Sequence, residues 1–417
     1  MAEAATTLLT TSDGRPLKAA LATAQSRAKR RAFLLVLPLL LFVLLTFLIP
    51  IGYMLKRSVE HDGFSASAPS LSAWFAAQSA FDPANPPEEA YAALVSDLAL
   101  MQKDKTTGMA GTRINYTVPG TISLFKAGAR AAKDLQPPFK DSLVALDPEW
   151  AMPRLWRAME AASTPYTTEF YNVATDRKLG DQGWQRGDDK DRIYLYLFFK
   201  TFLVSGVITL ICLLLAFPIA HLLAVLPMSK SSLLMILVLL PFWTSLLVRT
   251  TAWIALLQEQ GIVNDLLVWM GILSNDNRLQ AMYNMTGTIV AMTHVLLPFM
   301  ILPLYSVMRV IPPSYARAAR SLGATSWTTF RRIYVPQTLP GIAAGSLLVF
   351  ILAVGYYITP ALVGGADGQL ISNLISFHMA KSNWSLAAAL AAMLLAAILV
   401  LYWLYDRLIG IDRLKLG

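Results

Sequence analysis

The feature that most constrains the fold of this chain is a set of six long apolar segments. Each is near or above the length of about 20 residues that an α-helix needs to cross some 30 Å of hydrocarbon. Backbone polar groups cannot stay unpaired in lipid, so segments of this kind form helices. The pattern predicts an all-α integral membrane protein with six transmembrane helices. Their approximate ranges are 33–55, 194–226, 232–257, 286–308, 341–362 and 386–408.

The composition agrees with a membrane location. Charged residues make up 15% of the chain and the mean hydropathy is +0.50, whereas soluble domains average about 25% charged residues. The net charge of +9 does not indicate nucleic acid, because the cations lie beside apolar segments rather than on one soluble domain. We therefore expect the lipid bilayer, and no nucleic acid, as a partner. One cysteine and four histidines without ligand spacing indicate no metal site.

The polar stretches between the apolar segments divide the chain into regions. One of them has no apolar run long enough to cross a membrane, and its helical patterns over 88–103 and 148–162 predict a partly helical module. We call this stretch, residues 56–191, the insert. The predicted regions are a cytoplasmic basic N-terminus 1–32, transmembrane helix 33–55, the extracytoplasmic insert between helices 1 and 2, a five-helix core 192–410 and a cytoplasmic tail 411–417.

The charges of the short loops predict the orientation. The loop at 258–284 contains three acids and only one arginine, whereas the loop at 312–340, which we call the arginine loop, contains no acid. Positive charge in short loops marks the cytoplasmic side. This predicts cytoplasmic N- and C-termini and an arginine loop on the same side. The arginines at and near this loop are Arg309, Arg317, Arg320, Arg331 and Arg332.

The arginine loop itself reads as two short helices joined at a glycine. We expect Ser314 to cap the first helix, Gly323 to end it with a left-handed residue, and Thr325 or Ser326 to cap the second. Pro336 and Pro340 are expected to end that second helix. The apolar faces are formed by Tyr315, Ala318, Ala319 and Leu322 in the first helix and by Trp327 and Phe330 in the second. The pattern fits either a docking knob or a basic helix lying on anionic lipid.

The order of these residues resembles the EAA loop of ABC importer permeases. The resemblance rests on Ala318-Ala319, on Gly323, and on the runs 333–336 and 339–341. It implies a MetI-like permease core whose arginine loop sits in a groove of a cytoplasmic ATPase, with Tyr315, Ala318, Ala319, Leu322, Gly323, Trp327 and Phe330 as coupling residues. This chain has Arg317 where the family motif usually has glutamate. The exchange places a cation near a helix N-terminus, at a cost of about 0.3 to 1 kcal/mol.

Two further stretches, 239–253 and 355–365, resemble the permeases of spermidine/putrescine importers. That resemblance implies a polyamine cargo, a flexible cation that aromatic faces attract by about 0.5 to 2 kcal/mol each. The candidate pathway residues are Trp243, Thr244, Trp253, Tyr356, Tyr357, Thr359 and Asn373. Alternatively, Trp and Tyr near the ends of spans serve as interfacial anchors. For Arg249 we expect bonds to helix carbonyls or to a carboxylate such as Glu259.

The class of transporter follows from what the spans and loops contain. No predicted span interior carries a carboxylate, which argues against an ion-driven carrier, and the chain has no P-loop motif. ATP and Mg²⁺ are therefore expected on a partner ATPase, and the chain is expected to carry no cofactor and to be no enzyme. The expected partners in the bacterial inner membrane are an ATPase dimer, a second permease or second copy, and a periplasmic substrate-binding protein. The alternatives are another cargo, such as ferric ion, a phosphonate or a sugar derivative, or a membrane sensor or scaffold that binds ligand through the insert.

Overall fold

The computed structural model describes residues 17–409 in two compact units, Met1–Arg57 and Ser58–Gly417. The first unit is α1 (Leu17–Val43), a π-helical turn η1 (Leu44–Leu48) and α2 (Ile49–Arg57). Together they include an apolar helix of 34 residues, Ala24–Arg57, which contains the predicted span. The helix begins before the apolar run because the preceding Ala-, Lys- and Arg-rich residues are good helix formers. Residues 1–16 and the predicted tail 411–417 lie outside the described residues.

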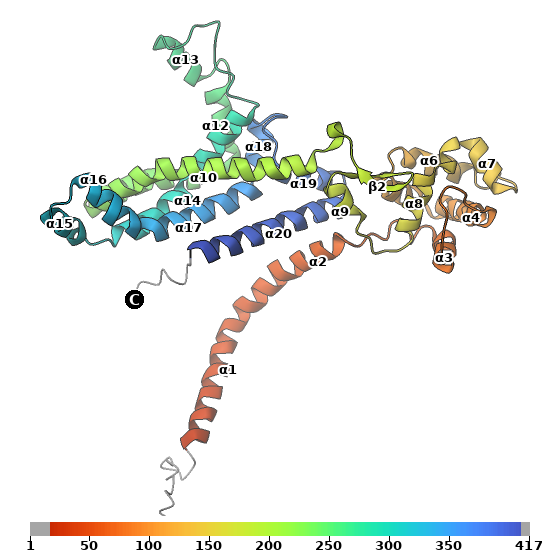
Figure 1. Cartoon of the computed structure of the whole chain (residues 1–417), viewed down its shortest axis with the longest axis horizontal. Helices are drawn as coiled ribbons and strands as arrows, with labels where there is room; N and C mark the ends of the chain where they lie inside the picture. The colour runs from red at the N-terminus through yellow and green to blue at the C-terminus, as the bar shows by residue number, and fades with distance from the viewer. Residues whose placement is uncertain (1–16, 410–417) are drawn as a thin grey trace, which may run out of the picture. The chain divides into compact units, whose positions relative to one another are not determined.

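The insert opens the second unit and is built mainly from short helices (Figure 1). A two-stranded antiparallel hairpin closes it, which the all-α prediction did not include. The predicted helix at 88–103 is present as α4, whereas that at 148–162 is divided at Pro153, which starts α8. The elements are α3 (Pro69–Ala77), α4 (Glu88–Asp104), α5 (Thr107–Asn115), α6 (Thr121–Ala131), α7 (Phe139–Leu146), η2 (Pro148–Ala151), α8 (Pro153–Ala162), α9 (Glu169–Ala174), β1 (Arg177–Gly180), β2 (Gly183–Arg186) and η3 (Asp189–Asp191).

An aromatic core holds the insert together. Trp150 and Trp156 are fully buried, and the indole N–H of Trp156 donates to the carbonyl of Trp150 at 2.8 Å. The ring of Tyr91 packs edge-on against Trp156. Gly128 provides the space for this core, since a Cβ there would lie 2.7 Å from Cζ2 of Trp150. The insert therefore has a hydrophobic core of its own, as an independently packed module requires.

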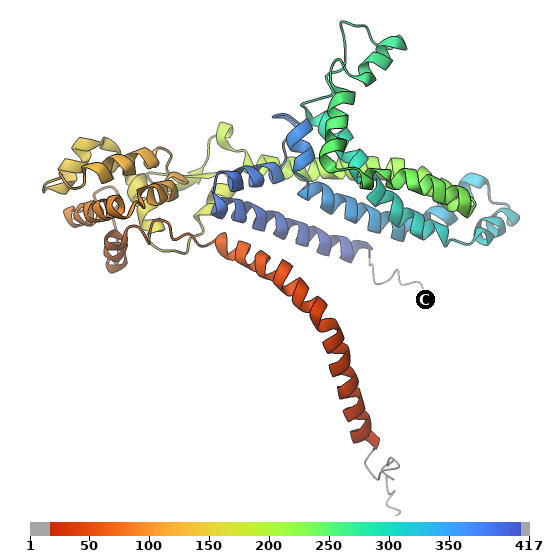
Figure 2. The ribbon, with the colours of Figure 1, turned by 180° about the vertical axis from the view of Figure 1, so that it is seen from behind.

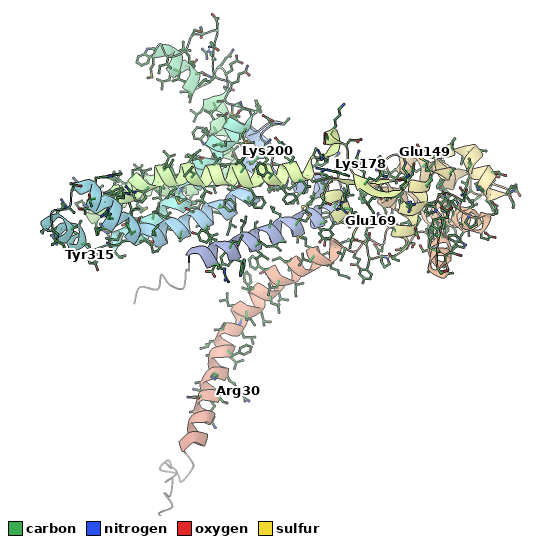
Figure 3. The ribbon with its side chains drawn as sticks, viewed as in Figure 1. Arg30, Glu149, Glu169, Lys178, Lys200 and Tyr315 are labelled. Atoms are coloured by element: carbon green, nitrogen blue, oxygen red, sulfur yellow. The ribbon has the colours of Figure 1, made fainter. Side chains whose placement is uncertain are left out.

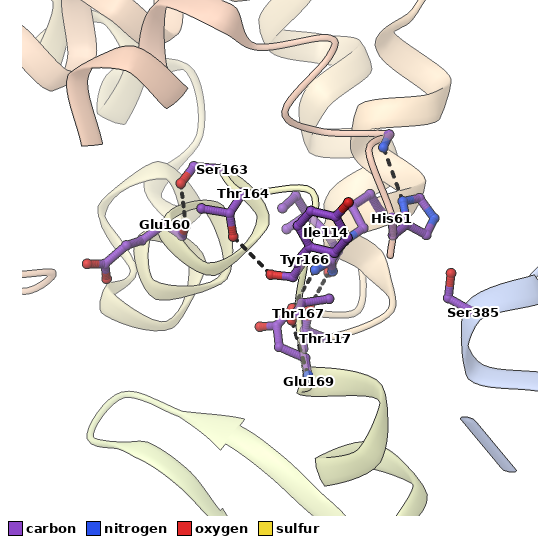
Figure 4. A network of polar contacts seen from close by, with 12 residues as sticks. His61, Ile114, Thr117, Glu160, Ser163, Thr164, Tyr166, Thr167, Glu169 and Ser385 are labelled. Carbon is purple, nitrogen blue, oxygen red and sulfur yellow. Dashed lines mark hydrogen bonds and ion pairs between the residues drawn. The ribbon is translucent and has the colours of Figure 1, made fainter. Parts of the chain in front are cut away.

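The two ends of the insert are joined where it meets the membrane helices. The amide of His61 donates to the carbonyl of Pro165 at 2.8 Å, and the amide of Thr167 donates to Val59 at 2.7 Å. Figure 4 shows this region, with His61, Tyr166, Thr167 and Glu169 from the insert and Ser385 from α20. The hydroxyl of Ser385 lies 3.4 Å from the carbonyl of Glu60. These contacts fix the insert to the start of the last long helix.

The remaining elements form the membrane part of the second unit. Five helices of the described chain, including that of the first unit, are long and apolar enough to span a membrane, or six if a bent pair counts as one span. The elements are α10 (Tyr194–Val225), α11 (Met228–Trp243), α12 (Leu246–Leu257), α13 (Ile262–Trp269), α14 (Met285–Arg309), α15 (Pro313–Ser321), α16 (Ser326–Thr329), η4 (Phe330–Tyr334), α17 (Val335–Gly355), α18 (Ile358–Val363), α19 (Ile371–Ala380) and α20 (Trp384–Ile409).

Helices α10, α14 and α17 pack together as the centre of the bundle. Figures 1 and 2 show them side by side with α20, while α12 and α13 project away from them. Small residues allow the close approach: a Cβ on Gly345 would lie 2.8 Å from Sδ of Met300, and one on Gly341 would lie 3.1 Å from the carbonyl of Pro303. Such small-residue contacts are the usual way in which membrane helices pack. The three helices therefore form a tightly packed centre.

The third predicted span, 232–257, is wrong as a single helix. It is divided after α11: the segments Met228–Trp243 and Leu246–Trp269 are bent by 98° with respect to each other, and α12 begins the second. The division has a local cause, because the Ser245 hydroxyl accepts the amide of Val248 at 3.1 Å and so starts a new helix. Arg249 then donates to the carbonyls of Pro241 and Thr244 at the break.

The predicted end of the second arginine-loop helix at Pro336 and Pro340 is also wrong. One continuous helical stretch runs from Ser326 to Gly355 through both prolines. The π-helical turn η4 interrupts the regular hydrogen-bond pattern within this stretch, and Pro336, which has no N–H to donate, follows directly after it. The predicted span 341–362 instead breaks at Tyr356, after which α18 begins.

Candidate functional site

The arginine loop folds as two helical pieces around a left-handed glycine. Gly323 has a φ of +88°, and the Thr325 hydroxyl accepts the amide of Thr328 at 3.2 Å, which confirms both predicted roles. The prediction that Ser314 caps α15 is wrong, because Pro312 occupies the cap position and Pro313 the first turn. Proline suits that turn because its fixed φ is already helical and its missing N–H would be unpaired anyway.

The apolar side chains of this loop face outward. Leu322 is 89% exposed, Trp327 is 67% exposed and Tyr315 is 53% exposed. Ala318 is exposed as well, and Ala319 is half-buried beside it. Figure 3 places Tyr315 at the end of the bundle opposite the insert. Exposed apolar side chains grouped on a basic surface are typical of a docking site, while the coupling role of these residues stays a prediction.

An aromatic column, which we define as Trp327, Phe330 and Tyr334, connects this loop to the bundle. The three rings stack in sequence, with centroids 5.8 Å and 6.1 Å apart. The column meets α10 at two points: Phe330 contacts Phe217 edge-on at 6.0 Å, and the Tyr334 hydroxyl lies 2.9 Å from Nδ1 of His221. The aromatic column thus joins the arginine loop to α10 by direct contacts.

The same end of α10 is fixed to α14. Nη1 of Arg309, the last residue of α14, donates to the carbonyls of Ala224 at 2.7 Å and Leu226 at 3.1 Å. Helix ends leave such carbonyls without intrahelical partners, and a cation there is favourable. The Ser231 hydroxyl donates to a third carbonyl, that of Leu223, at 2.8 Å. Hydrogen bonds therefore join α10, α11 and α14 at the end of the bundle next to the arginine loop.

Two breaks in the membrane helices form the second candidate site. At the break after α17, the Ser372 hydroxyl donates to the carbonyl of Tyr356 at 2.6 Å, and the Asn373 amide donates to that of Tyr357 at 2.7 Å. At the break after α11, Arg249 donates to the carbonyls of Pro241 and Thr244. This confirms the expectation that Arg249 bonds to helix carbonyls. Irregular backbone at membrane depth is tolerated where it is packed in protein or lines a water-filled cavity.

The structure brings some of the predicted pathway residues together. Trp253 donates its indole N–H to Nδ1 of His294 at 3.0 Å. This hydrogen bond joins α12 to α14, whereas Tyr356 lies in the break between α17 and α18. The sequence prediction omitted His294, although an ionisable residue within a span is itself a signal of function.

The other pathway candidates are placed differently. Trp243 is 75% exposed and Tyr357 is 45% exposed, and the Thr244 hydroxyl bonds to the carbonyl of Pro241. Both polar atoms of the Asn373 side chain are hydrogen-bonded, since its Oδ1 also accepts the amide of Leu370 at 3.1 Å. Thr359 is fully buried, and its hydroxyl has no hydrogen-bond partner among the described residues. A pathway role for these side chains remains a prediction.

Comparison with known proteins identifies the class of the chain. Residues 209–409 match the family of binding-protein-dependent transport system inner membrane components. The fold agrees with a solved bacterial ABC transporter involved in the import of the acidic polysaccharide alginate, with a TM-score of 0.50 at 17% sequence identity over 69% of this chain and 99% of the other. With the relatives described next, these findings place the chain in this family of membrane permeases.

The relatives are spermidine/putrescine transport system permease proteins PotB. This chain is 35% identical over 224 residues to the protein of Escherichia coli strain K12, covering 53% of this chain and 81% of that protein. It is 35% identical to the protein of Salmonella typhimurium strain SL1344, covering 77% of it, and 37% identical over 216 residues to that of Haemophilus influenzae, covering 75%.

Membership of the family has direct consequences. The chain is a multi-pass inner-membrane permease of an ABC importer and is not an enzyme. Importers of this kind imply a substrate-binding protein and an ATPase as partners. The resemblance predicted from the arginine loop and the two pathway stretches is confirmed at the level of the family. The family match begins at residue 209, after the insert.

Proposed function

We propose that this chain is the permease subunit of an ATP-driven importer that moves polyamines into the cytoplasm by alternating access. The main support for a polyamine cargo is the similarity to spermidine/putrescine permeases at 35 to 37% identity. The aromatic rings near the helix breaks support it, because Trp253 and Tyr356 offer faces that attract ammonium groups. Arg249 keeps its positive charge, and its guanidinium is directed toward the carbonyls of Pro241 and Thr244.

The energy for transport enters through the arginine loop. In this proposal a cytoplasmic ATPase dimer binds ATP and Mg²⁺ and receives Leu322, Ala319 and Tyr315 in a groove. Closure of the dimer displaces the loop, and the aromatic column transmits that displacement to α10. Because α10, α14 and α17 are closely packed, they tilt together and expose the pathway to the opposite side.

The remaining partners follow from the architecture. A second permease, or a second copy of this chain, completes the translocation pathway, and a periplasmic substrate-binding protein delivers the cargo. The orientation has both termini and the arginine loop in the cytoplasm and the insert outside. The position of the insert and the loop at opposite ends of the bundle supports this arrangement (Figure 3).

The cargo is tested by uptake of labelled spermidine into cells that express the complete transporter. We expect saturable uptake that unlabelled putrescine or spermidine suppresses. Ferric citrate, a phosphonate and an acidic oligosaccharide serve as competitors of the alternative classes and should have no effect. Suppression by one of these three, with none by polyamines, would assign a different cargo to the same machine.

A further inference from the structure

A cavity between three membrane helices belongs to neither of the sites described above. It has a volume of about 260 Å³ and lies between α10, α17 and α20, which Figures 1 and 2 show side by side. Sites for compact small molecules typically have volumes of about 300 to 1,000 Å³. The cavity therefore suits one slender group better than a whole solute molecule.

The cavity follows one face of α20. Ile398, Leu401, Tyr402 and Tyr405 line it, and their spacing of i, i+3, i+4 and i+7 places them on one side of the helix over a length of about 10 Å. Leu401 is 39% exposed and Tyr402 is 46% exposed. The cavity thus opens at the surface of the second unit, where the membrane helices face lipid.

The walls on the other two helices are apolar and firmly packed. Phe350 of α17 stacks on Phe202 of α10, with the ring centroids 6.2 Å apart. The Thr209 hydroxyl on α10 already donates to the carbonyl of Ser205 at 2.7 Å. A buried water needs two to four polar partners, and this almost entirely apolar surface does not offer them. The cavity is therefore suited to a hydrocarbon group.

Tyr405 is the polar exception in this lining. Its hydroxyl is buried and has no hydrogen-bond partner among residues 17–409. Buried tyrosine hydroxyls usually have a partner, because an unpaired donor loses the hydrogen bonds that it would make with water. The partner that completes this site is thus an acceptor attached to an apolar group.

The depth of Tyr405 in the membrane identifies that acceptor. Helix α20 begins at Trp384, so at 1.5 Å per residue Tyr405 lies about 32 Å along it, close to the thickness of the hydrocarbon layer. Nearby, the Arg407 guanidinium lies over the ring of Trp403, 5.8 Å from its centroid. Aromatic and basic side chains of this kind mark the boundary with the headgroups. At this boundary phospholipids carry their ester carbonyls.

We propose that the cavity binds one acyl chain of a glycerophospholipid, whose ester carbonyl accepts a hydrogen bond from Tyr405. The chain extends from the boundary toward Phe350 and Ile398 and packs against three helices at once. An α-helix is about 10 to 12 Å across with its side chains and cannot enter a space of this volume. The inference does not depend on the cargo or on coupling to an ATPase.

The test uses the full-length chain in phosphatidylglycerol nanodiscs that contain a small fraction of a photoreactive probe. The probe is an ester-linked phosphatidylglycerol with a diazirine midway along one acyl chain. After irradiation, peptide mapping locates the label, which we expect on residues 346–351 and 398–405. The bulk lipid is either ester-linked or its diether analogue, which has the same chains but no carbonyl.

Three variants separate the two parts of the site. Tyr405→Phe removes the hydroxyl and keeps the ring. Ser346→Leu fills part of the cavity from α17 and keeps Tyr405. The matched control is Tyr305→Phe, which removes the hydroxyl of a half-buried tyrosine in α14 that does not line the cavity.

In the wild type and in Tyr305→Phe, labelling should rise about two- to tenfold when the diether replaces the ester lipid, because the probe then has the only carbonyl. Tyr405→Phe should show the label without this rise, and Ser346→Leu should lose most of the label. Absence of label from both segments of the wild type would show that protein covers the cavity and would overturn the proposal. An equal rise in Tyr405→Phe would likewise overturn it.

Discussion

At the scale of single residues, Asp97 shows how the insert uses a buried charge. It is fully buried in α4, and its carboxylate accepts the amides of Ser70 at 3.0 Å and Leu71 at 2.7 Å at the start of α3. Burial raises the pKa of Asp97 above its ordinary value, although these hydrogen bonds oppose the shift. The side chain thus joins two helices at the cost of burying a charge.

The shifted pKa predicts a pH dependence. The folded insert binds the Asp97 proton more tightly than the unfolded chain does, so the contribution of this group to stability falls as the pH rises from about 3.9 through the raised pKa. Asp97→Asn should remove this dependence and cost about 1 to 2 kcal/mol, because the amide accepts only one of the two N–H groups. Hydrogen exchange of the α3 backbone amides, followed as a function of pH, measures both the pH dependence and the loss of stability. An unchanged pH profile in Asp97→Asn would contradict this account.

Trp253 provides a residue-scale test of the pathway. Trp253→Ala removes both the aromatic face and the hydrogen bond to His294, so polyamine uptake should fall while membrane abundance is unchanged. Trp253→Phe keeps an aromatic face and should retain more uptake than alanine. Tyr357→Ala, which lies at the other break, is expected to weaken uptake as well. If Trp253→Ala and Tyr357→Ala both transport normally, these rings are anchors rather than pathway residues.

At the scale of elements, the contact between His221 and Tyr334 tests how the loop is linked to α10. Tyr334→Phe keeps the stacked ring but removes the hydroxyl that lies 2.9 Å from His221. We expect a loss of about 0.5 to 1.5 kcal/mol from this contact and more ATP hydrolysed for each molecule transported. The ratio of ATPase activity to uptake in proteoliposomes measures this coupling. Tyr305→Phe, a tyrosine of α14 outside the aromatic column, is the control, and an equal change in both variants would argue against the column.

The elements also show how far the sequence predicts the structure. The long apolar segments gave the positions of most membrane helices, because spanning length is a property of the local sequence. The break at Tyr356 was not predicted, since Ser372 and Asn373, which bond to the carbonyls of Tyr356 and Tyr357, are distant in the sequence. The break at Thr244 depends on nearby residues, Ser245 and Arg249. The hairpin was missed for a related reason: its strands have only four residues each, too few for a clear alternation.

The candidate site was predictable to a similar extent. The turn at Gly323 and the cap at Thr325 depend on local chemistry and were predicted. The link from Trp253 to His294 joins two helices and needed the tertiary structure.

At the scale of the whole molecule, the orientation across the membrane is open to direct measurement. A cysteine placed at Ser123, on an exposed position of α6, should react with an impermeant reagent from outside the cell. A cysteine at Thr325, exposed in the arginine loop, should react only after permeabilisation. Cys212 is buried and should contribute little background. The reverse labelling pattern would invert the topology and remove the basis for cytoplasmic coupling.

The central claim is that the arginine loop couples this permease to an ATPase. Gly323 has a positive φ and a Cβ there would meet nothing within 4 Å, so Gly323→Val should cost about 1 to 2 kcal/mol through backbone strain alone. Gly323→Asn is the matched control, because asparagine tolerates this conformation. Ala319→Glu instead places a charge on the docking face. It should prevent the arginine loop from binding in the groove of the ATPase without disturbing the membrane spans.

The most direct measurement combines co-purification of the ATPase with ATP-dependent spermidine uptake in proteoliposomes. The account predicts that wild type and Gly323→Asn retain both the ATPase and uptake, and that Gly323→Val and Ala319→Glu lose both while reaching the membrane in normal amounts. If Gly323→Val and Ala319→Glu both bound the ATPase and transported spermidine as the wild type does, the loop would not be the coupling element, and a lipid-surface role would replace it.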